Sequence, residues 1–293
     1  MLEMKHVTKC FGEFKALDDL SLTVPRGAVY GLVGPNGAGK STAIRHLTGV
    51  YRPNSGEILM DGQPIYENDA IKARIGHIPD DIFFFPSATL EEMRKYYRGI
   101  YPKFDDALFQ RLCEVFQLPM KGAIRRFSKG MQKQAAFQLT IASRPDVMIL
   151  DEPVDGLDPV MRRQVWSLIL SDVAQYETTV LVSSHNLREL EDVCDHVGIM
   201  DHGKMLIERS LADMQGATCK LQIVGEVPAG LDILHESNSG RLKTLVVRGS
   251  TDAVIAKAQA AAPVYFDVLP LSLEEIFIYE LGGVNYEVKN IVL

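Results

Sequence analysis

Short apolar runs alternate with longer amphipathic segments along much of the chain. Residues 28–34, 147–150 and 179–182 are nearly continuous apolar runs of strand length. Segments whose apolar positions recur at helical spacing lie between and after these runs. Because buried strands that alternate with helices build a mostly parallel sheet with helices on its faces, the pattern predicts a layered α/β fold.

Two regions of the first part of the chain depart from this alternation. Residues 1–25 show strand patterns joined by a turn, and residues 55–65 show a hairpin around Asp61-Gly62. Residues from about 82 to 143 are mostly helical in pattern. We therefore expect an antiparallel β subdomain beside the main sheet and a helical subdomain inserted into the alternating part.

The pattern changes again after residue 216. Strand-like runs then alternate with two helical segments as far as the end of the chain at residue 293. A chain of 293 residues is longer than one ordinary domain needs. We predict a main domain at residues 1–216 and a small accessory α+β domain at residues 217–293.

Composition excludes several classes of protein. A net charge of −7 argues against nucleic acid as a partner. No apolar run approaches the roughly 20 residues that span a bilayer, and the first residues carry no signal peptide. The four cysteines have no metal-binding or disulfide-like spacing, which favours reduced thiols in a cytosolic protein, and they are Cys10, Cys113, Cys194 and Cys219.

A phosphate-binding loop follows the first buried strand. Residues 34–42, GPNGAGKST, match the pattern G-x-x-x-x-G-K-[ST] and lead into a helical segment. The glycines let successive N–H groups point at phosphate oxygens, Lys40 neutralises the β- and γ-phosphates, and Ser41 can bind Mg²⁺. The alternative is a glycine turn that only caps a helix. The predicted nucleotide-binding residues are Gly34, Pro35, Asn36, Gly37, Ala38, Gly39, Lys40, Ser41 and Thr42.

Acidic side chains follow a second buried strand. Met148–Leu150 lead directly into Asp151 and Glu152, which places both carboxylates at the sheet edge where ligands bind in open α/β folds. Asp151 suits Mg²⁺, and Glu152 suits a general base that polarises the attacking water. His185 ends a third buried run and can contact a γ-phosphate or that water, or else only cap the next helix.

The ordered set of motifs resembles the nucleotide-binding subunits of ABC transporters. The motifs are GPNGAGKST, FSKGMQ, MILDEP, DGLDP and SSH, and they fall within residues 1–216. In that family the segment around Ser128 and Gly130 is the signature motif. The resemblance implies that it contacts ATP held by an opposite subunit, so that two subunits, identical or paralogous, close head to tail on two ATP molecules. Ser128 can equally cap its own helix.

Further site residues come from the same resemblance. Asp158 would lie at the subunit interface, although an Asp-Pro turn before a helix is also an ordinary feature. Phe11 would stack on adenine, or else serve only the core, with Phe14 as the weaker candidate. Asp80 stands where the family usually has glutamine; it either joins Ser41 and Asp151 as a Mg²⁺ ligand or points to solvent.

The resemblance also implies a membrane partner. Residues 82–86, IFFFP, form an apolar cluster that either receives a helix of an integral membrane transporter subunit or is buried in the helical subdomain. The chain would then be the ATPase motor of a bacterial exporter-type transporter with separate membrane subunits. We expect it in the cytoplasm, peripheral on the inner face of the cell membrane. The rival functions are a soluble ABC-type ATPase acting on DNA or ribosomes and a nucleotide sensor without turnover.

Overall fold

The structure is a computed structural model that describes residues 1–281 of the chain. The chain divides into two compact units. The first comprises residues 1–185 and 196–208, and the second comprises residues 186–195 and the described residues from 209 onward. The domain boundary predicted at residues 216 and 217 stays a prediction. No helix among residues 1–281 combines the length and hydropathy needed to cross a membrane.

The first unit begins with an antiparallel sheet of four strands in the order β2-β1-β4-β5. Its strands are β1 (Leu2–Phe11), β2 (Phe14–Val24), β4 (Ser55–Met60) and β5 (Gln63–Pro64). On β2, Leu20, Leu22 and Val24 are buried, and the residues between them are more exposed. This period of two buries one face of the sheet and leaves the other face polar. The expected antiparallel subdomain is confirmed.

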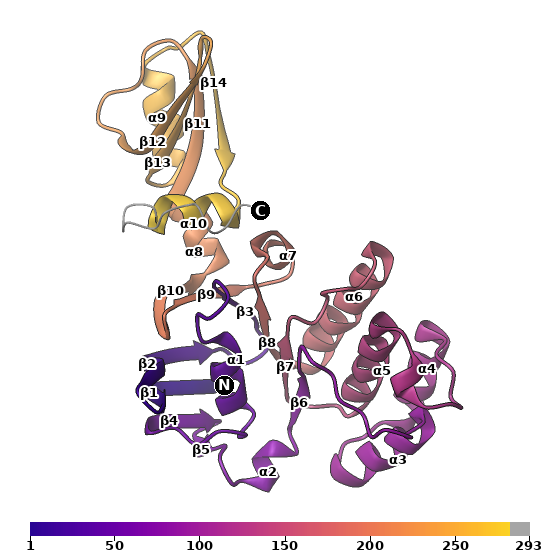
Figure 1. Cartoon of the computed structure of the whole chain (residues 1–293). Coiled ribbons are helices and arrows are strands. Elements are labelled where there is room, and N and C mark those ends of the chain that lie inside the picture. The colour runs from indigo at the N-terminus through magenta and orange to yellow at the C-terminus, as the bar shows by residue number, and fades with distance from the viewer. Residues whose placement is uncertain (282–293) are drawn as a thin grey trace. The chain divides into compact units, whose positions relative to one another are not determined.

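A six-stranded sheet forms the centre of the first unit, in the order β10-β9-β3-β8-β7-β6 (Figure 1). Five neighbouring strands run parallel, from β9 to β6. Three central strands, β3, β7 and β8, are buried along their whole length, which explains their nearly continuous apolar sequences. The strands are β3 (Val29–Val33), β6 (Ile75–Ile78), β7 (Val147–Asp151), β8 (Thr179–Ser184), β9 (His196–Asp201) and β10 (Lys204–Ser210).

The helices of the first unit include the expected helical insert, which Figure 1 shows as a group beside the central sheet. Thr89 and Glu92 form a capping box at the start of α3, and Asp105 caps α4. The helices are α1 (Lys40–Leu47), α2 (Asp69–Lys72), α3 (Leu90–Ile100), α4 (Asp106–Phe116), the 3₁₀ helix η1 (Ile124–Arg126), α5 (Lys129–Ala142) and α6 (Pro159–Tyr176).

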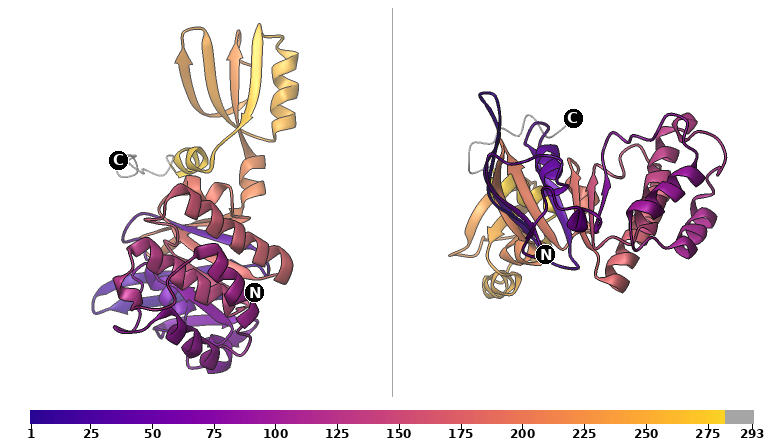
Figure 2. Two further views of the ribbon diagram at one scale, coloured as in Figure 1. Left: turned by 90° about the vertical axis from the view of Figure 1, so that its right-hand side faces the viewer. Right: turned by 90° about the horizontal axis from the view of Figure 1, so that it is seen from below.

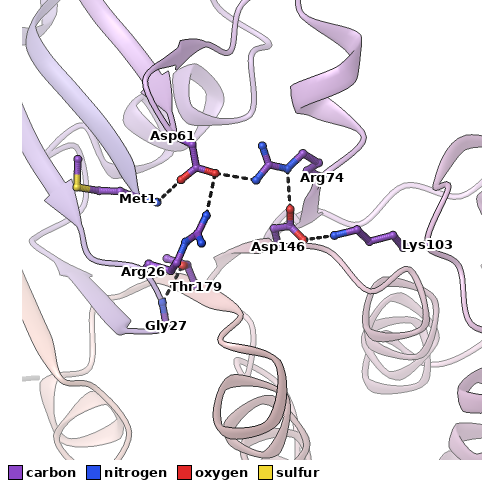
Figure 3. Close-up of polar contacts among 8 residues, drawn as sticks. All are labelled: Met1, Arg26, Gly27, Asp61, Arg74, Lys103, Asp146 and Thr179. Carbon is purple, nitrogen blue, oxygen red and sulfur yellow. Dashed lines mark hydrogen bonds and ion pairs between the residues drawn. The ribbon is translucent and has the colours of Figure 1, made fainter.

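An ion-pair network joins three parts of the first unit (Figure 3). Arg74 donates to Asp61, at the β4–β5 turn, and to Asp146, which precedes β7. Asp61 also pairs with Arg26, and Asp146 pairs with Lys103 of the helical insert. Hydrogen bonds from the α-amino group of residue 1 and from Arg74 hold the pKa of the Asp61 carboxyl well below its ordinary value.

The second unit holds an antiparallel sheet in the order β12-β13-β11-β14, with α9 against one face (Figure 2). Its core includes Leu221, Leu245, Val254 and Ala258. Strand β12 was not expected, because its residues are mostly polar and exposed. The elements are α7 (Leu187–Glu191), α8 (Leu211–Ala217), β11 (Thr218–Val224), β12 (Asp232–Ser239), β13 (Leu242–Arg248), α9 (Thr251–Ala260), β14 (Tyr265–Pro270) and α10 (Leu273–Leu281).

Candidate nucleotide-binding site

The predicted phosphate loop connects β3 to α1. Gly37 and Gly39 have φ angles of +84° and +105°, a backbone region that other residues rarely adopt. A Cβ atom at Gly39 would lie 2.9 Å from the carbonyl oxygen of Ala16, and one at Gly34 would lie 2.2 Å from that of Met200. The glycine positions of the motif are therefore required by backbone geometry as well as by close packing.

Lys40 is the first residue of α1 and points back across the loop. Its Nζ donates to the carbonyl oxygens of Gly34, at 2.6 Å, and Pro35, at 3.3 Å. Burial lowers the pKa of the Lys40 ammonium, and the carboxylates of Glu152 and Asp151 oppose that shift. The loop thus holds a largely buried cation directly beside two acidic groups.

The first of these acidic groups, Asp151, is the last residue of β7. It pairs in register with Ser183 of the adjacent parallel strand β8. The Oγ of Ser183 donates to Asp151 Oδ1, and Asp151 as a residue is only 8% exposed. This hydrogen bond fixes one carboxylate oxygen at the edge of the sheet where the phosphate loop also lies.

Glu152 has an unusual backbone and a defined side-chain partner. Its φ angle is +46°, which is uncommon for a residue other than glycine and typical of strained positions in functional sites. His185 Nδ1 lies 3.0 Å from Glu152 Oε2. Burial raises the pKa of the Glu152 carboxyl, although the hydrogen bond from His185 opposes this. A raised pKa brings this carboxylate closer to the range useful for a general base.

The loop and the acidic residues line one cavity of about 330 Å³. The cavity brings Asp80, from the segment after β6, together with Asp151 and Glu152. Asp80 thus lines the same cavity as the acidic pair, although the residue itself is exposed, and its binding to Mg²⁺ stays a prediction. The lining residues are Phe14, Ala16, Pro35, Asn36, Gly37, Ala38, Gly39, Lys40, Ser41, Thr42, Asp80, Asp151 and Glu152.

Two phenylalanines stand at the hairpin between β1 and β2. Phe11 and Phe14 are directly paired across the two strands, which places both side chains on one face of the hairpin. Phe14 lines the cavity, whereas the Phe11 ring packs edge-on against Tyr51, with ring centroids 5.6 Å apart. Both rings are substantially exposed. The assignment of Phe11 to adenine stacking remains a prediction, with Phe14 now a stronger alternative.

Six predicted residues are absent from the lining of this cavity: Phe11, Gly34, His185, Ser128, Gly130 and Asp158. The last three lie at the starts of α5 and α6. Ser128 caps α5 by accepting from the N–H of Met131 at 3.3 Å, and Asp158 caps α6 by accepting from two backbone N–H groups at 3.0 Å. A methyl group at Gly130 would lie 3.7 Å from Leu157 Cδ2, so the start of α5 lies next to the segment before Asp158. The capping roles exist in this structure, and the contacts with a second subunit remain a prediction.

The oxygen donors at the cavity fit Mg²⁺ when a phosphorylated ligand is also present. Ser41, Asp80 and Asp151 offer a hydroxyl and two carboxylates, the hard oxygen donors that Mg²⁺ prefers when phosphate oxygens complete its shell. Among residues 1–281 no three His, Cys, Asp or Glu side chains cluster as a self-sufficient metal site. These residues therefore fit a cation that is bound jointly with a phosphorylated ligand.

Sequence reasoning missed two polar residues of this region. Ser183 and Ser184 end the apolar run of β8, within the SSH motif, and the polar end of this strand was the available signal for the contact with Asp151. Lys133 lies in α5 and donates from Nζ to the carbonyl oxygen of Glu152 at 2.7 Å. Nothing in the local sequence distinguishes Lys133 from a solvent-exposed lysine of an amphipathic helix.

Comparison with known proteins decides the family. The sequence model of a protein family described as "ABC transporter" matches residues 17–155. A second family model, described as "AAA domain, putative AbiEii toxin, Type IV TA system", matches residues 121–191. The ABC transporter ATP-binding protein YtrB of Bacillus subtilis (strain 168) is 30% identical over 288 residues, which cover 97% of this chain and 99% of that protein. The chain belongs to the ABC transporter ATP-binding proteins. It is an ATP-binding component of an ABC transporter.

Other relatives of this ATP-binding component agree with the assignment. The bacitracin transport ATP-binding protein BcrA of Bacillus licheniformis is 36% identical over 213 residues, covering 71% of this chain and 69% of that protein. A solved ATP-binding subunit of an ABC transporter is 28% identical, with a TM-score of 0.69 over 73% of this chain and 92% of its own. A dimeric bacterial ABC transporter cassette, 22% identical, has a TM-score of 0.65 over 72% of this chain and 99% of its own and supports the fold.

Proposed function

We propose that this chain hydrolyses ATP and drives a separate membrane subunit of a transporter. The observation that carries the proposal is the position of Glu152, which lines the cavity together with Lys40 while His185 contacts its carboxylate. A triphosphate seated on the loop would extend its γ-phosphate toward that carboxylate. The arrangement supports turnover, since a nucleotide sensor has no need of a buried base beside the phosphate cradle.

The proposed chemistry assigns one task to each residue. Lys40 and the loop N–H groups stabilise the phosphate charge, and Glu152 polarises the attacking water. His185 orients the Glu152 carboxylate or contacts the γ-phosphate. Mg²⁺, bound with the nucleotide, would neutralise charge on the β- and γ-phosphates. Its proposed protein ligands are Ser41, Asp151 and Asp80.

The proposed assembly is a head-to-tail dimer, formed with a second copy or with a paralogue. Ser128 and Asp158 are exposed caps at the starts of α5 and α6, and Gly130 lies beside the segment that leads to Asp158. An exposed helix start with free backbone N–H groups suits a phosphate presented by a second subunit. One subunit would supply the cradle and the other the signature motif for each ATP.

The proposed docking surface for the membrane subunit lies at residues 82–86 and on α3. Phe83 and Phe85 are 77% and 48% exposed, whereas Phe84 between them is buried. Phe85 packs edge-on against Tyr96 of α3, with ring centroids 5.2 Å apart. Exposed aromatic side chains that gather in this way mark a partner surface. Through this surface we propose a peripheral position on the inner face of the membrane, in an exporter-type system.

The test combines hydrolysis and assembly in one variant, Glu152→Gln. Wild type should release phosphate from Mg-ATP, and the variant should lose turnover by roughly 100-fold or more because no base assists the water. The variant should also retain ATP and form a dimer, measured by nucleotide content and light scattering. Lys40→Ala, which cannot grip the phosphates, is the control that should neither bind nor dimerise.

Two results would contradict the proposal. Full turnover in Glu152→Gln would remove Glu152 from the mechanism. A variant that remains monomeric in Mg-ATP at every concentration, with no paralogue able to complete the pair, would refute the head-to-tail assembly. Co-purification of wild type with a multi-span membrane protein separates a transporter motor from a soluble ATPase.

A further inference from the structure

Lys133 places a buried ammonium group against the main-chain carbonyl of Glu152, the residue that carries the proposed catalytic carboxylate. The residue lies on α5 and is only 7% exposed, and its Nζ donates to the main-chain carbonyl oxygen of Glu152 at 2.7 Å. A lysine is seldom buried to this degree without a specific partner. The hydrogen bond to Glu152 therefore offsets part of the free-energy cost of removing the Lys133 ammonium group from water.

The surroundings of Lys133 are strongly acidic. Burial lowers the pKa of its ammonium, and four carboxylates oppose that change. In order of decreasing effect they are Asp80, Asp155, Glu152 and Asp151. Three of these carboxylates line the nucleotide cavity, where Lys40 supplies a cation on the phosphate side. Lys133 supplies a second cation from the side of the helical insert.

The hydrogen bond from Lys133 stabilises the main chain of Glu152, which has an uncommon conformation. Glu152 has a φ angle of +46°, and residues other than glycine reach this region only when neighbouring contacts enforce it. Its N–H group is held by Ser183, through both the carbonyl oxygen and Oγ at 3.2 Å. Its carbonyl group is held by Lys133. Contacts on both sides of the residue thus fix the direction in which the Glu152 side chain leaves the main chain.

We infer that Lys133 is a positioning residue that fixes the backbone of Glu152 and ties it to the helix that carries the signature motif. The inference rests on the proposed hydrolytic role of Glu152. Lys133 lies within the first turns of α5, which Ser128 caps. The helix that starts at the signature motif therefore contacts the main chain of Glu152 in its own chain. Contact of Ser128 and Gly130 with ATP on a partner would be transmitted along α5 to Glu152.

The experiment measures steady-state ATP hydrolysis by the full chain carrying Lys133→Met. We expect kcat to fall roughly 10- to 100-fold, as for loss of a hydrogen bond from a charged donor. The KM for ATP should stay within about twofold, because Lys133 is absent from the residues that line the described cavity. Lys133→Arg keeps the cation and the donors, and it should restore most of the lost kcat. Lys121→Met, at an exposed lysine of the same insert, is the matched control and should behave as wild type.

Each outcome has a defined meaning. An unchanged kcat in Lys133→Met, or equal losses in the Met and Arg variants, would overturn the inference. Fluorescence of Trp166, which lies in α6 of the same unit, reports whether each variant is folded. If Lys133→Met does not fold, Lys133→Gln decides: an intermediate kcat supports the inference, and a wild-type kcat overturns it. Absence of hydrolysis in wild type would instead refute the proposed function, so the two failures are distinguishable.

Discussion

Replacing His77 with phenylalanine should make the first unit less sensitive to acid. His77 lies on β6, and its buried Nε2 has no hydrogen-bond partner among the described residues. Burial is the largest cause that lowers the pKa of this histidine to about 4, and Asp151 opposes the shift. The folded protein therefore keeps the ring neutral at a pH where the unfolded chain already binds a proton.

The sign and size of the effect follow from these two values. Above the unfolded pKa of about 6.5 the histidine is neutral in both states and costs the fold no stability, and as the pH drops from there toward about 4 protonation of the unfolded chain lowers the free energy of unfolding. A difference of one unit between the folded and unfolded pKa corresponds to about 1.4 kcal/mol, so the full effect on the free energy of unfolding is roughly 3 kcal/mol. Between pH 7.5 and 5.5, about 1 to 1.5 kcal/mol of it should be lost from the free energy of unfolding.

Urea unfolding followed by Trp166 fluorescence measures this change within the first unit. Wild type should lose stability relative to His77→Phe as the pH falls from 7.5 to 5.5, and the variant should also lack the cost of an unpaired buried nitrogen. His202→Phe, at a side chain that is 92% exposed, controls for an added phenylalanine. Parallel pH dependences in wild type and His77→Phe would refute the reasoning.

Two further predictions concern the nucleotide cavity. Phe11→Ala should weaken ATP and GTP binding alike, by roughly 5- to 100-fold, because a stacked ring contacts the face of either base; if Phe14→Ala alone causes the loss in equilibrium nucleotide titrations, adenine stacking belongs to Phe14. Asp80→Gln should raise the Mg²⁺ concentration for half-maximal hydrolysis severalfold, since an amide is a weaker ligand than a carboxylate. An unchanged Mg²⁺ titration would show that Asp80 does not bind the ion.

The parts of the site that the sequence predicted best are short local motifs, each at the end of a buried strand. The phosphate loop, Asp151 and Glu152 each follow a buried strand, and parallel strands bring their carboxyl ends to one edge. Pattern and topology together were therefore enough to place Lys40 near the acidic pair. Asp80 came instead from the family resemblance, as the position where the family usually has glutamine; it follows β6, which pairs with β7.

The parts that the sequence did not predict depend on tertiary packing. Lys133 meets the carbonyl of Glu152 across 19 positions of sequence, and no local pattern encodes such a contact. The positive φ angle of Glu152 is likewise imposed by its neighbours. Strand β12 was missed because its polar residues lack the alternation that a half-buried strand shows. Whether Phe11 or Phe14 contacts the base depends on side-chain placement at a hairpin.

The ion pairs around Arg74 gather at one end of the central sheet of the first unit. Arg74 and Asp146 precede β6 and β7, and Arg26 precedes β3, so the network gathers at the amino ends of the parallel strands. The nucleotide cavity lies at the opposite, carboxyl ends. Because Asp61 and Lys103 tie the antiparallel sheet and the helical insert to this same end, we expect it to act as the fulcrum when ATP draws the two subdomains together.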